Sequence, residues 1–273
     1  MQSANAKRDI LYGNPQGFEL RGNLYSPAAA SVALPAIVCI HGGGFTQGSK
    51  DDTTVNAVAE VLIRHNFVCF AIDYRLAPDA RFPAAIEDCM CAVRFLRANA
   101  AKLGIRKDFI GAWGASAGGY LAAMLGTTGK QRVFRNSGGW SHESSEVTAV
   151  CDWFGPTDFS QLTIYSSSID RNLPDAPEAQ FLGCPINQNL RLVQRANPIA
   201  YVNASNPPFL IIHGDQDTFV PLHQSRILAA ALSKAGVCTT MHVHAGRGHG
   251  DGFFDNPDIL QMTAGFFRNH SEI

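Results

Sequence analysis

The sequence predicts an α/β fold with a mostly parallel central sheet and helices on both faces of that sheet. Short apolar runs alternate with longer amphipathic segments, and several of the apolar runs end in polar or glycine-rich turns. Uniformly apolar runs are typical of strands that are covered on both faces. The chain has 273 residues, of which 46% are hydrophobic, so we expect one large core and a single domain over residues 1–273.

The first half of the chain supplies four of the expected strands. Residues 17–26 alternate between apolar and polar side chains, which predicts an early antiparallel strand. Residues 35–40, 67–72 and 108–113 are largely apolar and predict buried strands. The helices expected between and after these strands cover residues 53–65, a segment that begins at Pro83, and residues 119–126.

The second half of the chain continues the alternation after a long interruption. Residues 147–154, 209–212 and 239–244 predict three further strands. Residues 159–206 lack strand signals and are rich in Ser, Asn and Pro, so we expect an insert that covers a pocket. The two remaining helices are expected over residues 222–235 and 259–268.

Residues 114–118, Gly-Ala-Ser-Ala-Gly, follow a predicted strand and precede a predicted helix. A serine on such a sharp turn projects its hydroxyl from the end of the sheet, and close packing there requires glycine two positions to either side. The motif alone is also compatible with a small-residue turn that packs a helix on a sheet. The strand and helix on either side favour Ser116 as a nucleophile.

A serine nucleophile needs a base, and the chain offers nine histidines. His41, His213 and His249 lie at or beyond the carboxyl ends of predicted strands, where open parallel sheets place their active sites. His249 lies in a glycine-rich loop that can reach Ser116, so we predict that it is the base. We expect His41 to fix the turn that it begins and His213 to be structural.

The base in turn needs a carboxylate that holds its tautomer. Residues 213–221 follow a strand and contain Asp215 and Asp217. We prefer Asp217, because Asp215 is close to the strand end and is better placed to stabilise the turn. The resulting order, Ser116, Asp217 and His249, places each group after a strand.

A developing oxyanion needs backbone N–H donors aimed at it. Ala117 supplies one donor at the start of a helix, and Gly43 and Gly44 supply the others, because glycine lets its amide approach a substrate closely. A merely flexible turn is the alternative interpretation of the three consecutive glycines. The presence of the serine motif makes the oxyanion hole the better prediction.

With these motifs in order, the chain resembles the α/β-hydrolase superfamily. Within it, the chain is most similar to the hormone-sensitive-lipase-like and bacterial feruloyl- and acetyl-esterase-like group. The resemblance implies serine hydrolysis of carboxylic esters without a cofactor or a metal. A long N-terminal helical cap, common in lipase-like members, is missing, which favours an open site and short-chain acyl or small aryl esters. The matching stretches are residues 41–45, 48–51, 73–78, 114–119, 152–158, 213–221 and 248–250.

Phe45, Trp153 and Phe154 are candidates for an apolar substrate-binding wall, and each is equally suited to the core. An arylformamidase-type amidase would use the same machinery and carries the same glycine turn. A non-catalytic binding protein with this fold is a further alternative, although such proteins usually lose a triad member. His242 and His244 share a strand face as a metal-ligand pair would, but no matching acidic or cysteine cluster accompanies them.

Composition limits the partners. The net charge is -1 and no basic stripe is visible, so we expect a small-molecule ester substrate and no nucleic acid. No apolar run is long enough to span a membrane. The polar N-terminus and seven cysteines, which we interpret as reduced thiols, favour a cytoplasmic protein, or a secreted one if a signal peptide has been removed. We expect a monomer or a homodimer.

Overall fold

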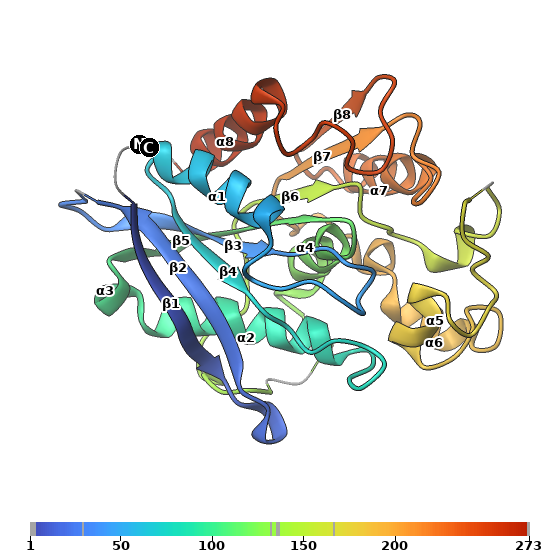
Figure 1. Ribbon diagram of the computed structural model, residues 1–273, viewed down its shortest axis with the longest axis horizontal. Helices are drawn as coiled ribbons and strands as arrows, with labels where there is room; N and C mark the ends of the chain where they lie inside the picture. The colour runs from blue at the N-terminus through green and yellow to red at the C-terminus, as the bar shows by residue number, and fades with distance from the viewer. Residues whose placement is uncertain (1–3, 29, 132, 135–136, 166, 272–273) are drawn as a thin grey trace.

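An eight-stranded sheet forms the centre of the protein, whose computed structural model describes residues 4–28, 30–131, 133–134, 137–165 and 167–271. In chain order the strands are β1 (Ala4–Gly13), β2 (Leu20–Pro27), β3 (Leu34–Ile40), β4 (Val68–Ile72), β5 (Ile105–Ala115), β6 (Val150–Trp153), β7 (Phe209–Gly214) and β8 (Thr239–His244). Their order across the sheet is β1-β2-β4-β3-β5-β6-β7-β8 (Figure 1). β2 pairs antiparallel with β1 and β4, whereas the pairs from β4 to β8 are parallel.

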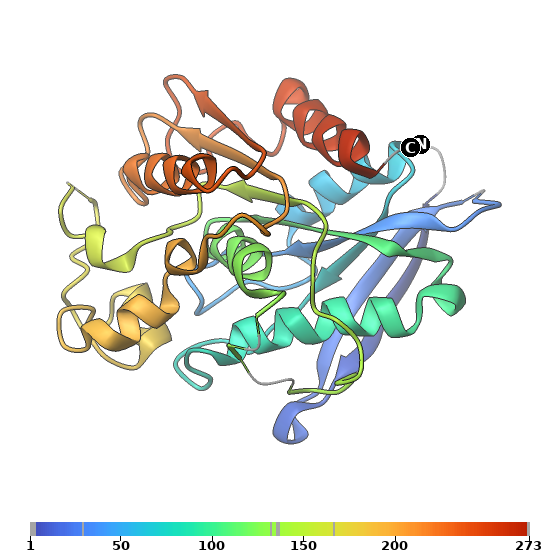
Figure 2. The same ribbon diagram turned by 180° about the vertical axis from the view of Figure 1, so that it is seen from behind.

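Helices cover both faces of this sheet (Figures 1 and 2). The α-helices are α1 (Thr53–Arg64), α2 (Ala84–Ala98), α3 (Ala100–Leu103), α4 (Ala117–Thr128), α5 (Pro177–Leu182), α6 (Leu190–Ala196), α7 (His223–Lys234) and α8 (Pro257–Ser271). Short 3-10 turns occupy Pro15–Gly17, Phe159–Gln161 and Pro198–Tyr201. Val38 and Ile40 of β3 share an apolar cluster with α2, α4 and α7, whereas Ile37 and Cys39 share one with α1 and α8. Both faces of β3 are therefore buried, which explains its uniformly apolar sequence.

The parallel sheet with helices on both faces confirms the fold class that the sequence predicted. The sequence did not predict β1, because its first six residues are all exposed and include the polar side chains of Asn5, Lys7, Arg8 and Asp9. β1 is an edge strand, where polar side chains are tolerated and help to prevent pairing with other chains. Within 159–206 the described residues form the short helices α5 and α6, together with two 3-10 turns, and no strand.

The turn around Ser116 joins β5 to α4 and has little space for side chains. Ser116 has a φ of 57° and a ψ of -121°, a strained conformation for a residue with a side chain. A Cβ on Gly114 would lie 2.1 Å from the carbonyl oxygen of Gly118, and a Cβ on Gly118 would lie 2.1 Å from that of Ile40. Glycine is therefore required at both positions, and the serine stands at the carboxyl end of the sheet.

Two further features of the fold are the pairing of the cysteines and the apolar character of the helices. None of the seven cysteines is paired with another; five are buried, Cys184 is half-buried and Cys238 is exposed. Among the described residues, no helix combines the length and the apolar character that a membrane crossing needs.

We expect Gly118→Ala to destabilise the fold strongly, because the new Cβ would overlap the backbone of β3. The loss in the free energy of unfolding should exceed about 2 kcal/mol, as for an overpacked core position. Gly265→Ala in α8 is the matched control, because a Cβ there meets nothing within 4 Å. Replacing this helical glycine should stabilise the protein by about 0.5–1 kcal/mol. Urea denaturation of both variants tests the expectation, and equal effects would contradict it.

Candidate active site

Ser116, His249 and Asp217 form a hydrogen-bonded chain at the carboxyl ends of β5, β8 and β7. Nε2 of His249 lies 2.9 Å from Oγ of Ser116, and Nδ1 of His249 lies 2.7 Å from Oδ2 of Asp217. An ionised carboxylate only accepts hydrogen bonds, so Nδ1 carries the proton and Nε2 is left to accept the serine hydroxyl. This is the arrangement in which a serine, a base and an orienting carboxylate work together.

The carboxylate of Asp217 is buried and fully bonded. Its Oδ1 accepts the backbone N–H groups of Phe219 and Val220, both at 2.8 Å, while Oδ2 contacts His249. Burial by itself raises the pKa of Asp217, but hydrogen bonds from His213 and His249 outweigh it and hold that pKa well below its usual value. Asp217 therefore stays ionised over the whole range in which the protein is expected to work.

His213 is a neighbour of Asp217 that the sequence analysis treated only as structural. Its Nε2 lies 2.8 Å from the carbonyl oxygen of Val220 and 3.2 Å from Oδ2 of Asp217, and its Nδ1 lies 2.7 Å from Oγ of Ser225. The ring is fully buried, so these contacts fix its orientation. The sequence did not predict this contact; the signal that could have found it is the four-residue spacing between His213, near the end of β7, and Asp217.

The glycine turn after β3 lies beside the serine. Gly42, Gly43 and Gly44 line the same cavity as Ser116, and a Cβ on Gly42 would lie 3.5 Å from the Cβ of Ser116. Gly43 and Gly44 have φ values of 105° and 58°, which glycine adopts without strain. Ala117 is the first residue of α4. Backbone amides at a helix start and in a glycine turn are those that acyl-transfer sites use to bind an oxyanion.

His41 anchors the start of this turn. Its ring stacks on Tyr74 with 4.2 Å between ring centroids, and its Nδ1 lies 2.7 Å from the carbonyl oxygen of Gly42. Burial lowers the pKa of His41, so the ring is held neutral. A Cβ on Gly48 would lie 2.4 Å from Nδ1 of His41, so the chain that leaves the turn passes directly over the ring.

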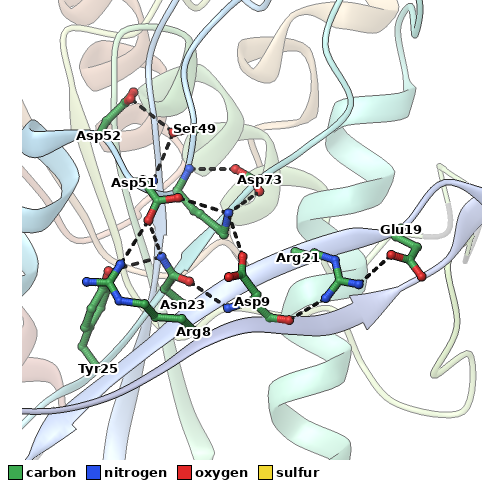
Figure 3. Close-up of polar contacts among 11 residues, drawn as sticks. Arg8, Asp9, Glu19, Arg21, Asn23, Tyr25, Ser49, Asp51, Asp52 and Asp73 are labelled. Carbon is green, nitrogen blue, oxygen red and sulfur yellow. Dashed lines mark hydrogen bonds and ion pairs between the residues drawn. The ribbon is translucent and has the colours of Figure 1, made fainter.

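Lys50 anchors the end of the turn to the first hairpin (Figure 3). Its ammonium lies 3.1 Å from Asp73 and 3.2 Å from both Asp9 and Asp51, and its backbone N–H donates to Asp73 at 2.8 Å. Burial opposes the charge, but the hydrogen bonds with Asp73 and Asp51 outweigh it and raise the pKa of Lys50. Asp9 belongs to β1, so the strand that the sequence did not predict helps to position the candidate oxyanion turn.

A cavity of about 370 Å³ opens over Ser116. One wall is aromatic and includes Phe154 and Phe219, whose rings lie 4.8 and 5.1 Å from that of His249. Of the described residues in segment 159–206, Pro177 lines this cavity. The polar lining comes from Thr46, Gln47, Asp52 and Thr54.

Two of the aromatic residues proposed for the substrate wall lie in the core instead. Phe45 is 2% exposed and stacks on Phe181 at 4.2 Å, and Trp153 is fully buried with its ring 5.2 Å from that of Trp113. Neither is among the described residues that line the cavity, whereas Phe154 is. Phe154 follows the last residue of β6 and has a φ of 44°, so its side chain does not continue the alternation of the strand that holds Trp153.

The histidine pair on β8 has no further ligands beside it. The rings of His242 and His244 lie 6.4 Å apart. Throughout the described ranges there is no group of three or more His, Cys, Asp or Glu residues that could hold a metal ion.

Asp152 lies at the other side of the serine turn. It is fully buried, its Oδ1 accepts the N–H of Gly155 at 2.9 Å, and a Cβ on Gly119 would lie 2.3 Å from that oxygen. Burial raises the pKa of Asp152 to about 6, against the opposing effects of the Gly155 N–H and of His213.

The chain is similar to known esterases in sequence and in fold. The family model described as BD-FAE matches residues 23–232. Esterase LipC of Mycobacterium tuberculosis is 31% identical over 256 residues, which cover 91% of this chain and 60% of LipC. The chain spans about half the length of the curated relatives that it matches.

Two solved structures share the fold over nearly their whole length. A truncated carbohydrate esterase from gut microbiota has a TM-score of 0.89 at 29% identity, covering 98% of this chain and 97% of that one. The butyrate-bound esterase Est2 of the Planctomycetes species Thermogutta terrifontis has a TM-score of 0.78 at 25% identity, covering 97% and 94%.

We expect Asp217→Asn to lower kcat/KM for p-nitrophenyl acetate by a factor on the order of 10² or more, because the amide no longer holds the Nδ1–H tautomer of His249. Asp215→Asn is the matched control. Oδ1 of Asp215 accepts the N–H of Gly246 at 2.7 Å, a bond that an asparagine oxygen can keep. Equal losses in the two variants would show that Asp217 does not orient His249.

We expect Asp152→Asn to stabilise the protein more at high pH than at low pH. The folded state holds the Asp152 proton more tightly than the unfolded chain, so the stability contribution of Asp152 falls as pH rises from about 4 to about 6. Asparagine does not titrate, so its advantage over aspartate should be about 2 kcal/mol larger at pH 8 than at pH 4. Urea denaturation at both pH values measures this difference, and a pH-independent effect would contradict the raised pKa.

Proposed function

Because the chain belongs to the BD-FAE family, we propose that it is a serine carboxylesterase that hydrolyses short-chain acyl or small aryl esters. The supporting observation is the hydrogen-bonded chain of Ser116, His249 and Asp217, in which Ser116 and His249 line a cavity of about 370 Å³. A nucleophile, a base and an orienting carboxylate in mutual hydrogen-bond reach are the parts that acyl transfer needs.

In the first half of the proposed reaction, Oγ of Ser116 attacks the ester carbonyl carbon while its proton passes to Nε2 of His249. Asp217 accepts a hydrogen bond from the Nδ1–H of His249 throughout. Because the low pKa of Asp217 keeps its carboxylate ionised, the negative charge stabilises the imidazolium of His249. The tetrahedral intermediate then expels the alcohol, which takes the proton from His249. The product of this half is an ester between the acyl group and Ser116.

In the second half, His249 removes a proton from water as the water oxygen attacks the acyl carbon. The second tetrahedral intermediate expels Oγ of Ser116, which recovers its proton from His249, and the carboxylic acid leaves. In both halves the backbone N–H groups of Gly43, Gly44 and Ala117 bind the oxyanion. No other reactant than ester and water is consumed.

The size and lining of the cavity support a short or compact acyl group. A volume of about 370 Å³ is at the small end of ligand pockets, and it must also hold part of the alcohol. Each buried CH₂ contributes about 0.8 kcal/mol, so a long chain gains affinity only where a deep apolar slot exists. The Thermogutta esterase, which is similar in fold, binds butyrate, and this short acyl group is consistent with the size class.

The test is a series of p-nitrophenyl esters from acetate to palmitate, together with N-formylkynurenine. We expect kcat/KM to be highest for acyl groups of about two to four carbons, because further CH₂ groups stay in water and add no binding energy. A maximum at decanoate or longer would contradict the short-acyl proposal. Formamide turnover well above acetate turnover would instead indicate an arylformamidase-type amidase.

Ser116→Ala is the inactive control for this series of esters. Loss of the nucleophile of a triad lowers kcat by about 10⁶-fold, so the variant should fold normally and turn over none of the esters measurably. A fluorophosphonate probe should label the parent protein and not the variant. Failure to label the parent would indicate a non-catalytic binding protein.

A further inference from the structure

A buried ion pair lies in the segment between β6 and β7, outside the groups that the proposed reaction uses. The side chains of Arg171 and Glu178 are 2% and 3% exposed, and Nη1 of Arg171 contacts Oε1 of Glu178. Residues 172–175, beside this pair, are exposed. Moving two charges out of water costs free energy, and apolar residues of the same size often stabilise a protein equally well. Stability alone is therefore a poor reason for an ion pair at this position.

Arg171 reaches the candidate catalytic groups through Phe219. Its Nη2 donates to the carbonyl oxygen of Phe219, and its guanidinium lies 5.6 Å from the centroid of the Phe219 ring. Phe219 also contacts the candidate catalytic groups. Its backbone N–H donates to Oδ1 of Asp217, and the centroid of its ring lies 5.1 Å from that of His249. One residue thus connects Arg171 with both the base and its carboxylate.

Glu178 is connected to the cavity wall beside the glycine turn through the preceding residue, Pro177. Pro177 begins α5, drawn in yellow in Figure 1, and lines the cavity together with Phe219. A Cβ on Gly44 would lie 3.3 Å from the Cβ of Pro177, so Pro177 packs on the candidate oxyanion turn. The ion pair therefore joins a residue on the oxyanion side of the cavity to a residue on the base side.

We propose that Arg171 is a positioning residue that, through its ion pair with Glu178, fixes two parts of the cavity wall, Pro177 beside the glycine turn and Phe219 beside His249. The pair thereby aligns His249 with Ser116 and limits the acyl group that fits between the walls. This inference rests on the proposed ester hydrolysis. Ser167 and Ser168 add further attachments on the base side. The hydroxyl of Ser167 donates to the carbonyl oxygen of Phe219 at 3.3 Å, and the backbone N–H of Ser168 donates to that of Thr218 at 2.8 Å.

The decisive variant is Arg171→Met with Glu178→Met. It removes both charges together, so no unpaired charge is left in the core, and the melting temperature should stay close to that of the parent. The rate of fluorophosphonate labelling and kcat for p-nitrophenyl acetate should each fall about tenfold, because small misplacements of a catalytic group slow the reaction. The kcat/KM ratio of octanoate to acetate should rise at least about fivefold, because the walls can move apart.

Two further variants provide a control ion pair and a test of the Phe219 ring alone. Glu60→Met with Arg64→Met removes an exposed ion pair on α1, whose side chains are 74% and 62% exposed, and should change neither rate nor ratio. Phe219→Leu keeps the backbone hydrogen bonds of residue 219 and removes only the ring. It should raise the octanoate-to-acetate ratio as the double variant does, with a smaller loss in the labelling rate.

Each outcome bears on the inference. A stable Arg171→Met, Glu178→Met protein with the parent's labelling rate and acyl preference would overturn it while leaving ester hydrolysis in place. If that protein does not fold, Phe219→Leu decides, because an unchanged acyl ratio there would overturn the role of the wall. A parent protein that neither hydrolyses the esters nor reacts with the probe would overturn the proposed function and, with it, this inference.

Discussion

The absence of space around Ser116 is the constraint on which the rest of the site depends. A Cβ at Gly114 or Gly118 would lie 2.1 Å from a carbonyl oxygen, and one at Gly119 would lie 2.3 Å from the carboxylate of Asp152. β3, β5, β6 and the start of α4 therefore meet in van der Waals contact, and only glycine fits between them. This contact holds Ser116 at a φ of 57° and presents its hydroxyl at the sheet edge.

The groups that face the serine are held by charge and hydrogen bonds in addition to close backbone contact, which a Cβ on Gly43 would show by lying 2.1 Å from the carbonyl oxygen of Gln47. Asp217 is fixed by two backbone N–H groups and two histidines, and its low pKa keeps it charged. The glycine turn is fixed at its far end by Lys50, which three carboxylates surround (Figure 3). Interactions of this kind are weakened by solvent, so their burial matters more than their number.

The sequence predicted the parallel sheet from signals that are local. Apolar runs marked the strands, and Ser116, Asp217 and His249 lie within hydrogen-bond distance because parallel strands end at one edge. It missed β1, whose polar sequence suits an edge strand and has no periodicity of its own. It could not separate core from pocket for Phe45 and Trp153, because an aromatic residue after a strand looks the same in either place.

The contact between Arg171 and Phe219 joins residues that are 48 positions apart in the sequence, and no local sequence pattern predicts it. It also sets a physical limit on how the site can change. Loops on a rigid scaffold usually vary without affecting the elements below them. Here the backbone of Phe219 holds Asp217 while its ring forms the cavity wall. Acyl-group size and the alignment of the base therefore depend on the same residue, so a change in the segment that carries Arg171 alters both together.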